Sequence, residues 1–332
     1  MNAETVARLF RCGLETAKKT LKATTQRGVR QSRHSLNGRY YRVDHLNHHR
    51  RRLHDTFYMD ALFPKVTSLS GFTCAQLISS GTFIRIFPME SKLSSEIAQA
   101  LYEFINNVGV SDSLTHALAA EQIGRHTDVV KLIRRLNIKP RLAEKGRGTT
   151  QNNRAEAEIC EVKTKPSRLW DYDLVYIAEV QSLLARGPVS RPVIEHLTGN
   201  TVDILEWLDF DFYERVCYWD QKKMDMTDKQ AKLGRWLGIA HQVESNMTYW
   251  ILTESGKVIA RSTVQHVTLT DVATDEMKTR VLMLDNRVIE RLQDDNFDIH
   301  LPDGVFYLQD DNVDDPLDTC AARQGIRGHV TT

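Results

Sequence analysis

Two acidic residues almost a hundred positions apart have the types and settings best suited to chemistry in this sequence. Asp60 lies in the aromatic, strand-favouring run 57–64, which ends at a proline and is soon followed by a glycine. Glu156 lies in residues 155–162, where apolar residues recur along one helical stripe. A strand carboxylate and a distant helix carboxylate are what a two-metal phosphoryl-transfer site needs. The alternative is an ordinary edge-strand aspartate and a solvated helix glutamate.

The segments around these acids, and those that follow them, carry further motifs. They are MDALFPKVTSLSGFTCAQLISSGTFIRIFPM, RLWDYDLVYIAEV, and a later series that includes TGNTVDILEWLDFDFYERVCYWD and LGRWLGIAHQVESNMTYWILTESGKVIARSTVQHV. Together they resemble the integrase region of copia-type LTR retrotransposons, in particular the diverged elements of diatoms and other protists. The resemblance extends from about residue 13 to about residue 297.

This resemblance implies a DNA-integrating enzyme, a DDE polynucleotidyl transferase, with an RNase H-like core. In that family an Asp, a second Asp and a Glu bind two divalent ions, Mg²⁺ or Mn²⁺, and join DNA ends to a target. By position Asp60 matches the first acid, and Glu156, in the N-x-x-A-E form that begins at Asn153, matches the last. The resemblance also implies DNA as the partner and a homo-oligomer, with no membrane and no small-molecule substrate.

The middle acid of this family pattern is missing. The family has roughly L-x-x-D-G-A-x-E where residues 114–121 here have LTHALAAE, so Ala117 stands in the place of the second aspartate. The separations of 57 residues from Asp60 to Ala117 and 39 from Ala117 to Glu156 fit the family spacing. Because a methyl group cannot ligate a metal, we expect this chain to be catalytically impaired.

Neighbouring side chains offer little replacement for the missing ligand. Asp112 lies five residues before Ala117, roughly 16 Å away along an extended strand, and cannot reach the vacant position. Glu121 and His116 are closer, but either could replace the ligand only if the loop were rebuilt.

The predicted catalytic helix is also shorter than in the family. Pro166 stops it soon after Glu156, which removes a cationic face that would lie along DNA ends. The basic residues that remain are our predicted nucleic-acid contacts. These are Arg147, Arg154 and Lys163 around the helix, and Arg50, Arg51 and Arg52 upstream of the core. For the run 50–52, a solvated charge run is the alternative.

The composition is that of an ordinary globular protein, and the charged residues are unevenly distributed along the sequence. The 332 residues are 41% hydrophobic and 26% charged, with a net charge of +1. Residues 1–54 carry thirteen Lys and Arg against three Asp and Glu, whereas residues 271–332 carry six against fourteen. The basic front favours a polyanionic partner. Five scattered cysteines without a C-x-x-C pair, and no apolar run that would span a membrane, favour a reduced protein of the nucleus or cytoplasm.

The expected fold class is α/β: an RNase H-like five-stranded mixed sheet with flanking helices, a basic helical N-terminal region and a small C-terminal β-barrel. The expected domains are 1–52 (basic helices), 53–186 (integrase catalytic core), 187–270 (linker and β-rich domain) and 271–332 (acidic helix and disordered tail). The core elements are expected at strands 53–63, 72–79, 82–88, 110–116 and 138–142, and at helices 94–108 and 128–137. Beyond the core we expect a helix at 174–184, four or five short strands within 209–219, 234–240, 247–253 and 258–267, and a helix at 274–292.

The sequence leaves two interpretations open for the N-terminal helices and two for the aromatic residues of the C-terminal half. The N-terminal helices 5–10 and 14–23 are either a DNA-docking helix-turn-helix or a hairpin that packs on the core. The aromatic residues Trp219, Trp236, Tyr249 and Trp250 either fill a core or stack on bases. The sequence therefore predicts an integrase-like nucleic-acid-binding protein with a degenerate active site. An active integrase with a substitute ligand, and a domesticated DNA-binding protein, are the alternatives.

Overall fold

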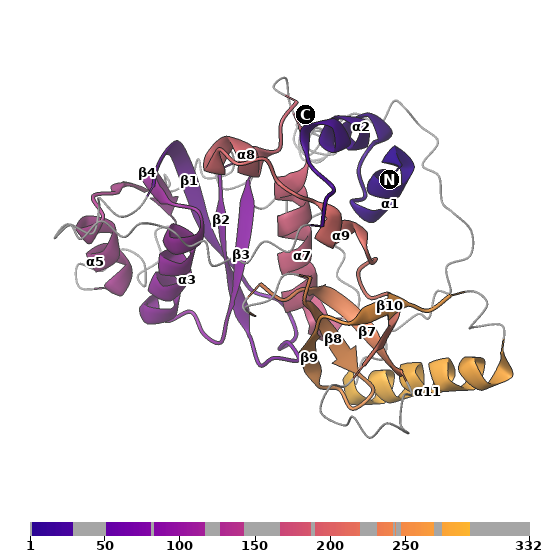
Figure 1. Ribbon diagram of the computed structural model, residues 1–332. Helices are drawn as coiled ribbons and strands as arrows, with labels where there is room; N and C mark the ends of the chain where they lie inside the picture. Colours follow the sequence, from indigo (N-terminus) through magenta and orange to yellow (C-terminus); the bar gives the residue numbers. More distant parts are fainter. Residues whose placement is uncertain are drawn as a thin grey trace, which may run out of the picture.

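The computed structural model describes residues 2–28, 51–80, 83–116, 127–142, 167–186, 190–219, 231–241, 243, 247–268 and 274–292. Two five-stranded sheets form the framework of this part of the chain, with helices packed on both (Figure 1). Among the described residues, no helix combines the length and the apolar character needed to cross a lipid bilayer.

The first sheet has the strand order β3-β2-β1-β4-β5. Its strands are β1 (Arg52–Leu62), β2 (Cys74–Ser79), β3 (Ile84–Met89), β4 (Val110–His116) and β5 (Lys139–Leu142). The first three form an antiparallel meander, whereas β4 pairs parallel with β1 and β5 pairs parallel with β4. This order and these directions are those of an RNase H-like core, so the predicted core fold is confirmed.

Helices cover both faces of this sheet. On one face lie α3 (Ser94–Asn107) and α5 (Asp128–Arg135), whose apolar sides pack on alternate residues of the strands. Phe57 of β1 makes an edge-to-face contact with Phe104 of α3, with 5.1 Å between ring centroids. Such pairs contribute about 0.5–1.5 kcal/mol beyond the area they bury. On the other face, α7 (Trp170–Leu183) packs on β2 and β3; it begins four residues earlier than predicted.

The second sheet has the order β10-β6-β7-β8-β9. Its strands are β6 (Arg215–Tyr218), β7 (Lys232–Ile239), β8 (Tyr249–Thr253), β9 (Val258–Arg261) and β10 (Val264–His266), and α11 (Asp275–Leu292) packs on it. Of the four or five short strands predicted here, the structure shows five, and the range 258–267 contains two of them. The chain bends at Ser262 and Thr263, so β9 pairs with β8 while β10 pairs with β6 at the other end of the order. The predicted strand 209–219 is too long, because residues 211–214 form a turn before β6.

The N-terminal helices α1 (Ala3–Leu9) and α2 (Leu14–Ala23) form a hairpin that packs on α7 and on α9 (Leu205–Leu208). Val6 and Phe10 are buried there against residues such as Leu183. The segment after α2 is held by Asp203, whose carboxylate accepts the backbone N–H groups of Arg27 and Gly28 at 3.0 Å each. The structure shows these helices packed as a hairpin, and their docking on DNA stays a prediction. The short helix α8 (Val193–Thr198) completes the described helices near this region.

Candidate functional site

Asp60 lies close to the end of β1, the central strand of the first sheet, where its Cα partner on β2 is Leu77. Phe57 and Met59 point to the face covered by α3, so strand alternation places Asp60 on the opposite face. Its carboxylate is half-buried, and Oδ1 accepts the backbone N–H of Ala61 at 2.9 Å. The backbone carbonyl of Asp60 accepts a 2.6 Å hydrogen bond from the buried side-chain amide of Gln76. The position of Asp60 is therefore fixed by strand pairing and by a side chain of the neighbouring strand.

Small hydroxyl side chains line the same face of β1 and β4 beside Asp60. Thr56 is the Cα partner of Ser113, and their hydroxyl oxygens are 2.7 Å apart. Thr115 is the partner of Tyr58, and both Ser113 and Thr115 are buried. Parallel strands inside a sheet are usually apolar on both faces. A polar lining next to a central carboxylate therefore departs from the usual core packing of such strands.

Sequence reasoning missed this polar lining. Its signal is the alternation in VSDSLTH, where serine, serine and threonine at 111, 113 and 115 share one face while Val110 and Leu114 share the other. The apolar cluster beneath α7 draws its strand residues chiefly from β2 and β3 and includes only Leu62 from β1. The polar lining of Thr56, Ser113 and Thr115, the polar strip of this sheet, thus begins where this apolar cluster ends.

The loop after Asp60 is held by the start of α7. The indole Nε1–H of Trp170 donates to the carbonyl oxygen of Val66 at 2.8 Å, and the N–H of Leu69 donates to the carbonyl of Arg168 at 2.7 Å. Burial raises the pKa of Asp171, although hydrogen bonds from Ser70 and its neighbours oppose that effect. The motif RLWDYD of the sequence therefore acts, in part, by fixing the backbone that follows the Asp60 strand.

Several predicted site residues lie outside the described part of the chain. They are Arg50, Ala117, Arg147, Arg154, Glu156 and Lys163. The relation of Asp60 to Glu156 and to the vacant third position stays a prediction. Within the described residues, β4 ends at His116, whose Cα partner on β1 is Met59.

The described residues alone do not fit a divalent metal site. Among them, no three His, Cys, Asp or Glu side chains come close enough together to hold an ion. Asp112 does not approach Asp60: its carboxylate lies 3.4 Å from Arg52 Nε and 3.3 Å from His54 Nδ1, near the start of β1. The Asp112 side chain also points to the face of β4 opposite Ser113. Both its distance from Asp60 and its direction therefore prevent it from replacing a metal ligand beside Asp60.

Arg51 and Arg52 lie at the far end of β1 from Asp60. Eight residues separate Arg52 from Asp60, which is about 26 Å along a strand. The Arg52 guanidinium donates to the carbonyl oxygens of Leu136 and Asn137, at 2.8 and 3.1 Å, which ties β1 to the end of α5. The role of these arginines in binding nucleic acid stays a prediction. Their position means that they and Asp60 would contact different parts of a bound duplex.

A buried acid that the sequence analysis did not single out joins the two sheets. Glu179 of α7 accepts hydrogen bonds from Arg85 at 3.0 Å and from Trp207 at 3.3 Å, and its Oε1 lies 2.6 Å from Nε2 of His241. Burial tends to raise the pKa of Glu179, but His241 and Arg85 outweigh it and lower the pKa to about 2. Because these partners come from β3, from α9 and from the end of β7, the cluster is a structural connection.

The aromatic residues of the second sheet are mainly core residues. Trp236 is fully buried and Tyr249 is almost so, and each packs against Phe210. Trp219 and Trp250 are only partly buried. For Trp236 and Tyr249, the core-filling interpretation is therefore the one that the structure shows.

No protein-family model matches the sequence, and no curated protein matches it. Among solved structures, the chain is similar to the catalytic core domain of BIV integrase, with 11% identity over 43% of this chain and 93% of that chain and a TM-score of 0.32. It is also similar to a chain of the simian T-cell lymphotropic virus intasome in complex with PP2A regulatory subunit B56 gamma, with 11% identity over 66% of this chain and 84% of that chain and a TM-score of 0.30. These values are too low to carry an argument, so the fold assignment rests on strand order and pairing.

Proposed function

We propose that this protein is a copia-type retrotransposon integrase-like protein that binds DNA and whose catalytic centre is impaired. One observation carries the proposal: Asp60 follows Met59, the β1 residue that pairs with His116 at the end of β4. The residue after His116 is Ala117, so an alanine follows the strand that lies beside the acidic one. In a metal-dependent nuclease fold this is where a second carboxylate is needed.

The loss of that carboxylate supports impairment over activity. Loss of a residue that merely orients a metal ligand already costs about 10–100-fold in affinity or activity. Here the substituted residue would itself be a ligand, and fewer carboxylates also supply less negative charge for two dications. Asp112, the nearest acid on β4, is tied to Arg52 at the other end. Binding of Mg²⁺ or Mn²⁺ is therefore expected to be weak in this chain.

Binding to DNA is the part of the function that we expect to remain. It is supported by the excess of ten positive charges in residues 1–54. We further propose that the second sheet is a small β-barrel left open between β9 and β10, which stand at opposite ends of its strand order with only two residues between them. We also propose a homo-oligomer in the nucleus or cytoplasm.

A strand-transfer assay on oligonucleotides that mimic element ends tests the impaired centre. With Mg²⁺ or Mn²⁺ we expect no turnover by the natural chain, because one metal ligand is an alanine. Ala117→Asp should gain metal-dependent turnover, and Ala117→Asp combined with Asp60→Asn should lose it again.

Two results would contradict the proposal. Turnover by the natural chain that Asp60→Asn abolishes would show that another group supplies the third ligand. Retained turnover in the double variant would show that Asp60 is not a ligand. The melting temperature of each variant serves as the control for folding.

A further inference from the structure

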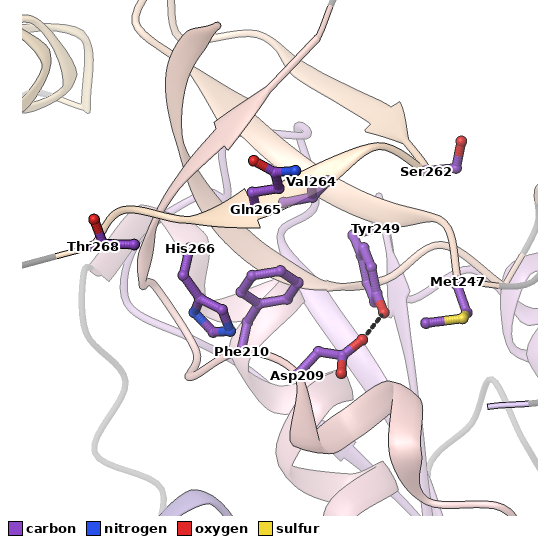
Figure 2. A pocket seen from close by; sticks show the side chains of 9 residues that line it. All are labelled: Asp209, Phe210, Met247, Tyr249, Ser262, Val264, Gln265, His266 and Thr268. Atoms are coloured by element: carbon purple, nitrogen blue, oxygen red, sulfur yellow. Dashed lines mark hydrogen bonds between the residues drawn. The ribbon is translucent and has the colours of Figure 1, made fainter. Parts of the chain in front are cut away.

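A cavity of about 470 Å³ lies at the second sheet, outside the site around Asp60. It is lined by three stretches that are distant in sequence: the residues after α9, the start of β8, and the bend between β9 and β10 with the segment that follows it (Figure 2). The lining residues are Asp209, Phe210, Met247, Tyr249, Ser262, Val264, Gln265, His266 and Thr268. Its volume falls within the range of about 300–1,000 Å³ that is usual for ligand pockets.

Asp209 is the acidic group of this cavity. Its Oδ2 accepts a hydrogen bond from the Tyr249 hydroxyl at 2.6 Å (Figure 2), and burial raises the pKa of Asp209. A carboxylate offers about four acceptor positions, and a phenol occupies one of them. A half-buried carboxylate with a neutral hydrogen-bond donor is stabilised by a further donor, above all by a cationic one.

The other acids of the segment 206–214 are engaged differently. Asp211 forms an ion pair with Arg8. Glu214 lies 2.8 Å from Nδ1 of His266 through Oε1, and Glu206 accepts the backbone N–H of Met247 at 3.2 Å. Each of these three acids thus has a partner of its own. Of the four, Asp209 is the one that lines the cavity itself.

Aromatic rings lie next to this carboxylate. Phe210 packs on His266 with 4.5 Å between ring centroids and on Tyr249 with 5.5 Å. In Figure 2, Phe210 and His266 lie to one side of Asp209 and Met247 lies to the other. Phe210 and Tyr249 are buried, so the exposed ring of His266 is the aromatic surface that a ligand would meet beside Asp209. The aliphatic part of a long basic side chain also packs well on such a surface.

The strand that borders the cavity suits a peptide. β10 stands at one end of the sheet order, so among the described strands only β6 pairs with it. A strand edge of this kind can pair with an extended backbone, while a neighbouring pocket selects the side chain. A bare metal ion suits the cavity less, because no cluster of three potential ligands occurs among the described residues.

We propose that this cavity binds the cationic side chain of a basic peptide, with the Asp209 carboxylate as its counter-ion. The ligand chemistry is a guanidinium or a primary ammonium on a flexible stem. This inference does not depend on the proposed function, since it needs neither metal binding nor DNA.

The test uses the full-length, isotope-labelled protein and three capped five-residue peptides that differ at the central residue. That residue is arginine, lysine or citrulline, the last being a neutral near-isostere of arginine. We expect the arginine or the lysine peptide to shift the amide resonances of Tyr249 and His266. The shifts should saturate as peptide is added and so give a dissociation constant. The citrulline peptide should bind at least about tenfold more weakly, because a charge-assisted hydrogen bond contributes about 1.5–3 kcal/mol. The comparison of arginine with lysine decides which cation is preferred.

Variants test the role of Asp209. Asp209→Asn keeps an acceptor for Tyr249 but removes the charge, so it should weaken binding of the cationic peptide at least about tenfold. The matched control is Asp275→Asn, which removes an acidic side chain that is 97% exposed, on α11, and should change affinity less than about twofold. Gln265→Arg, at an exposed position of the cavity rim, should also weaken binding by placing a cation at its mouth.

Three results would overturn the proposal. The first is that the citrulline peptide binds as tightly as the cationic peptides. The second is that folded Asp209→Asn and Gln265→Arg proteins both bind the cationic peptide with unchanged affinity. The third is that neither cationic peptide shifts a resonance at millimolar concentration. Shifts of the same resonances with duplex DNA but not with peptide would assign the cavity to nucleic acid and would equally reject the peptide.

Discussion

At the scale of single residues, two buried acids of the described chain are paired with basic side chains from distant segments. Asp285 of α11 is almost fully buried and meets the guanidinium groups of Arg215 and Arg235 from two strands. Glu179 of α7 likewise meets Arg85 and His241. Such groups are costly to bury alone, so loss of one member leaves the others unpaired in a medium that solvates charge poorly.

Glu179→Gln should lower the free energy of unfolding at pH 7 by about 3–5 kcal/mol, because Arg85 loses its carboxylate partner. The folded-state pKa of Glu179 is lowered to about 2, from the 4.5 that is usual for a glutamate carboxyl. Its ionised form therefore stabilises the fold above about pH 4.5, and this stabilisation disappears as the pH falls towards 2. Urea titrations of the natural chain and the variant at pH 7 and pH 3 measure the effect.

The control for this prediction is Glu254→Gln, which removes an ion pair with Arg287 whose side chains are more than half exposed. It should change stability by less than about 1 kcal/mol. A destabilisation by Glu179→Gln that does not shrink as the pH falls from 4.5 would contradict the assigned pKa.

At the scale of elements, the connection between α3 and β4 determines where the polar strip lies. Gly109 stands in this connection with φ of +143°, a region that residues with a Cβ rarely adopt. A Cβ at this position would lie 2.7 Å from the carbonyl oxygen of Arg51. The N–H of Val110 donates to that same carbonyl, which starts the parallel pairing of β4 with β1. The glycine therefore permits the close approach that sets the register beside Asp60.

Gly109→Ala should destabilise the protein by more than about 2 kcal/mol, since it combines an unfavourable φ with a contact on backbone that cannot move freely. Gly71→Ala is the matched control, because Gly71 also has positive φ, of +92°, but its Cβ would meet nothing within 4 Å. It should cost about 1 kcal/mol. Thermal unfolding of both variants gives the comparison, and equal losses would show that the approach to Arg51 is not limiting.

At the scale of the whole molecule, charge separates along the chain. The excess of basic residues lies in 1–54 and the excess of acidic residues in 271–332. A protein that neutralises phosphates releases counterions, so its affinity for duplex DNA falls steeply as salt concentration rises. Within the described residues, the basic residues near the start of β1 and the acid Asp60 occupy opposite ends of the same strand, so a bound duplex would need to extend along the sheet to contact both.

Arg50→Gln and Lys163→Gln should each weaken binding to duplex DNA and reduce the slope of log K against log salt by about 0.9. Lys278→Gln on α11, whose side chain bonds Asp275, is the control and should leave the slope unchanged. Affinities for duplex DNA measured from about 50 to about 300 mM salt give the slopes, because counterion release governs the salt dependence of binding in this range. A slope near zero for the natural chain would show that no phosphates are neutralised.

Local sequence patterns were sufficient to predict most elements of the first sheet and one of the N-terminal helices. The strand Val110–His116 and the helix Leu14–Ala23 occur with the predicted bounds, and the remaining core strands differ by about two residues at most. Such elements are predictable because hydrophobic periodicity and breakers such as Gly109 act locally. The sequence also singled out Asp60, since an acid in an aromatic strand is unusual on local grounds alone.

The surroundings of those elements became known from the three-dimensional arrangement alone. It placed Thr56 and Ser113 side by side and connected Glu179 to His241, and it assigned the two halves of the range 258–267 to opposite ends of one sheet. Local patterns do not contain these pairings, because each joins residues tens of positions apart whose contact depends on the register of strands and on how helices pack. The same reason explains why the cavity at Asp209 could not be anticipated: three separate segments build it.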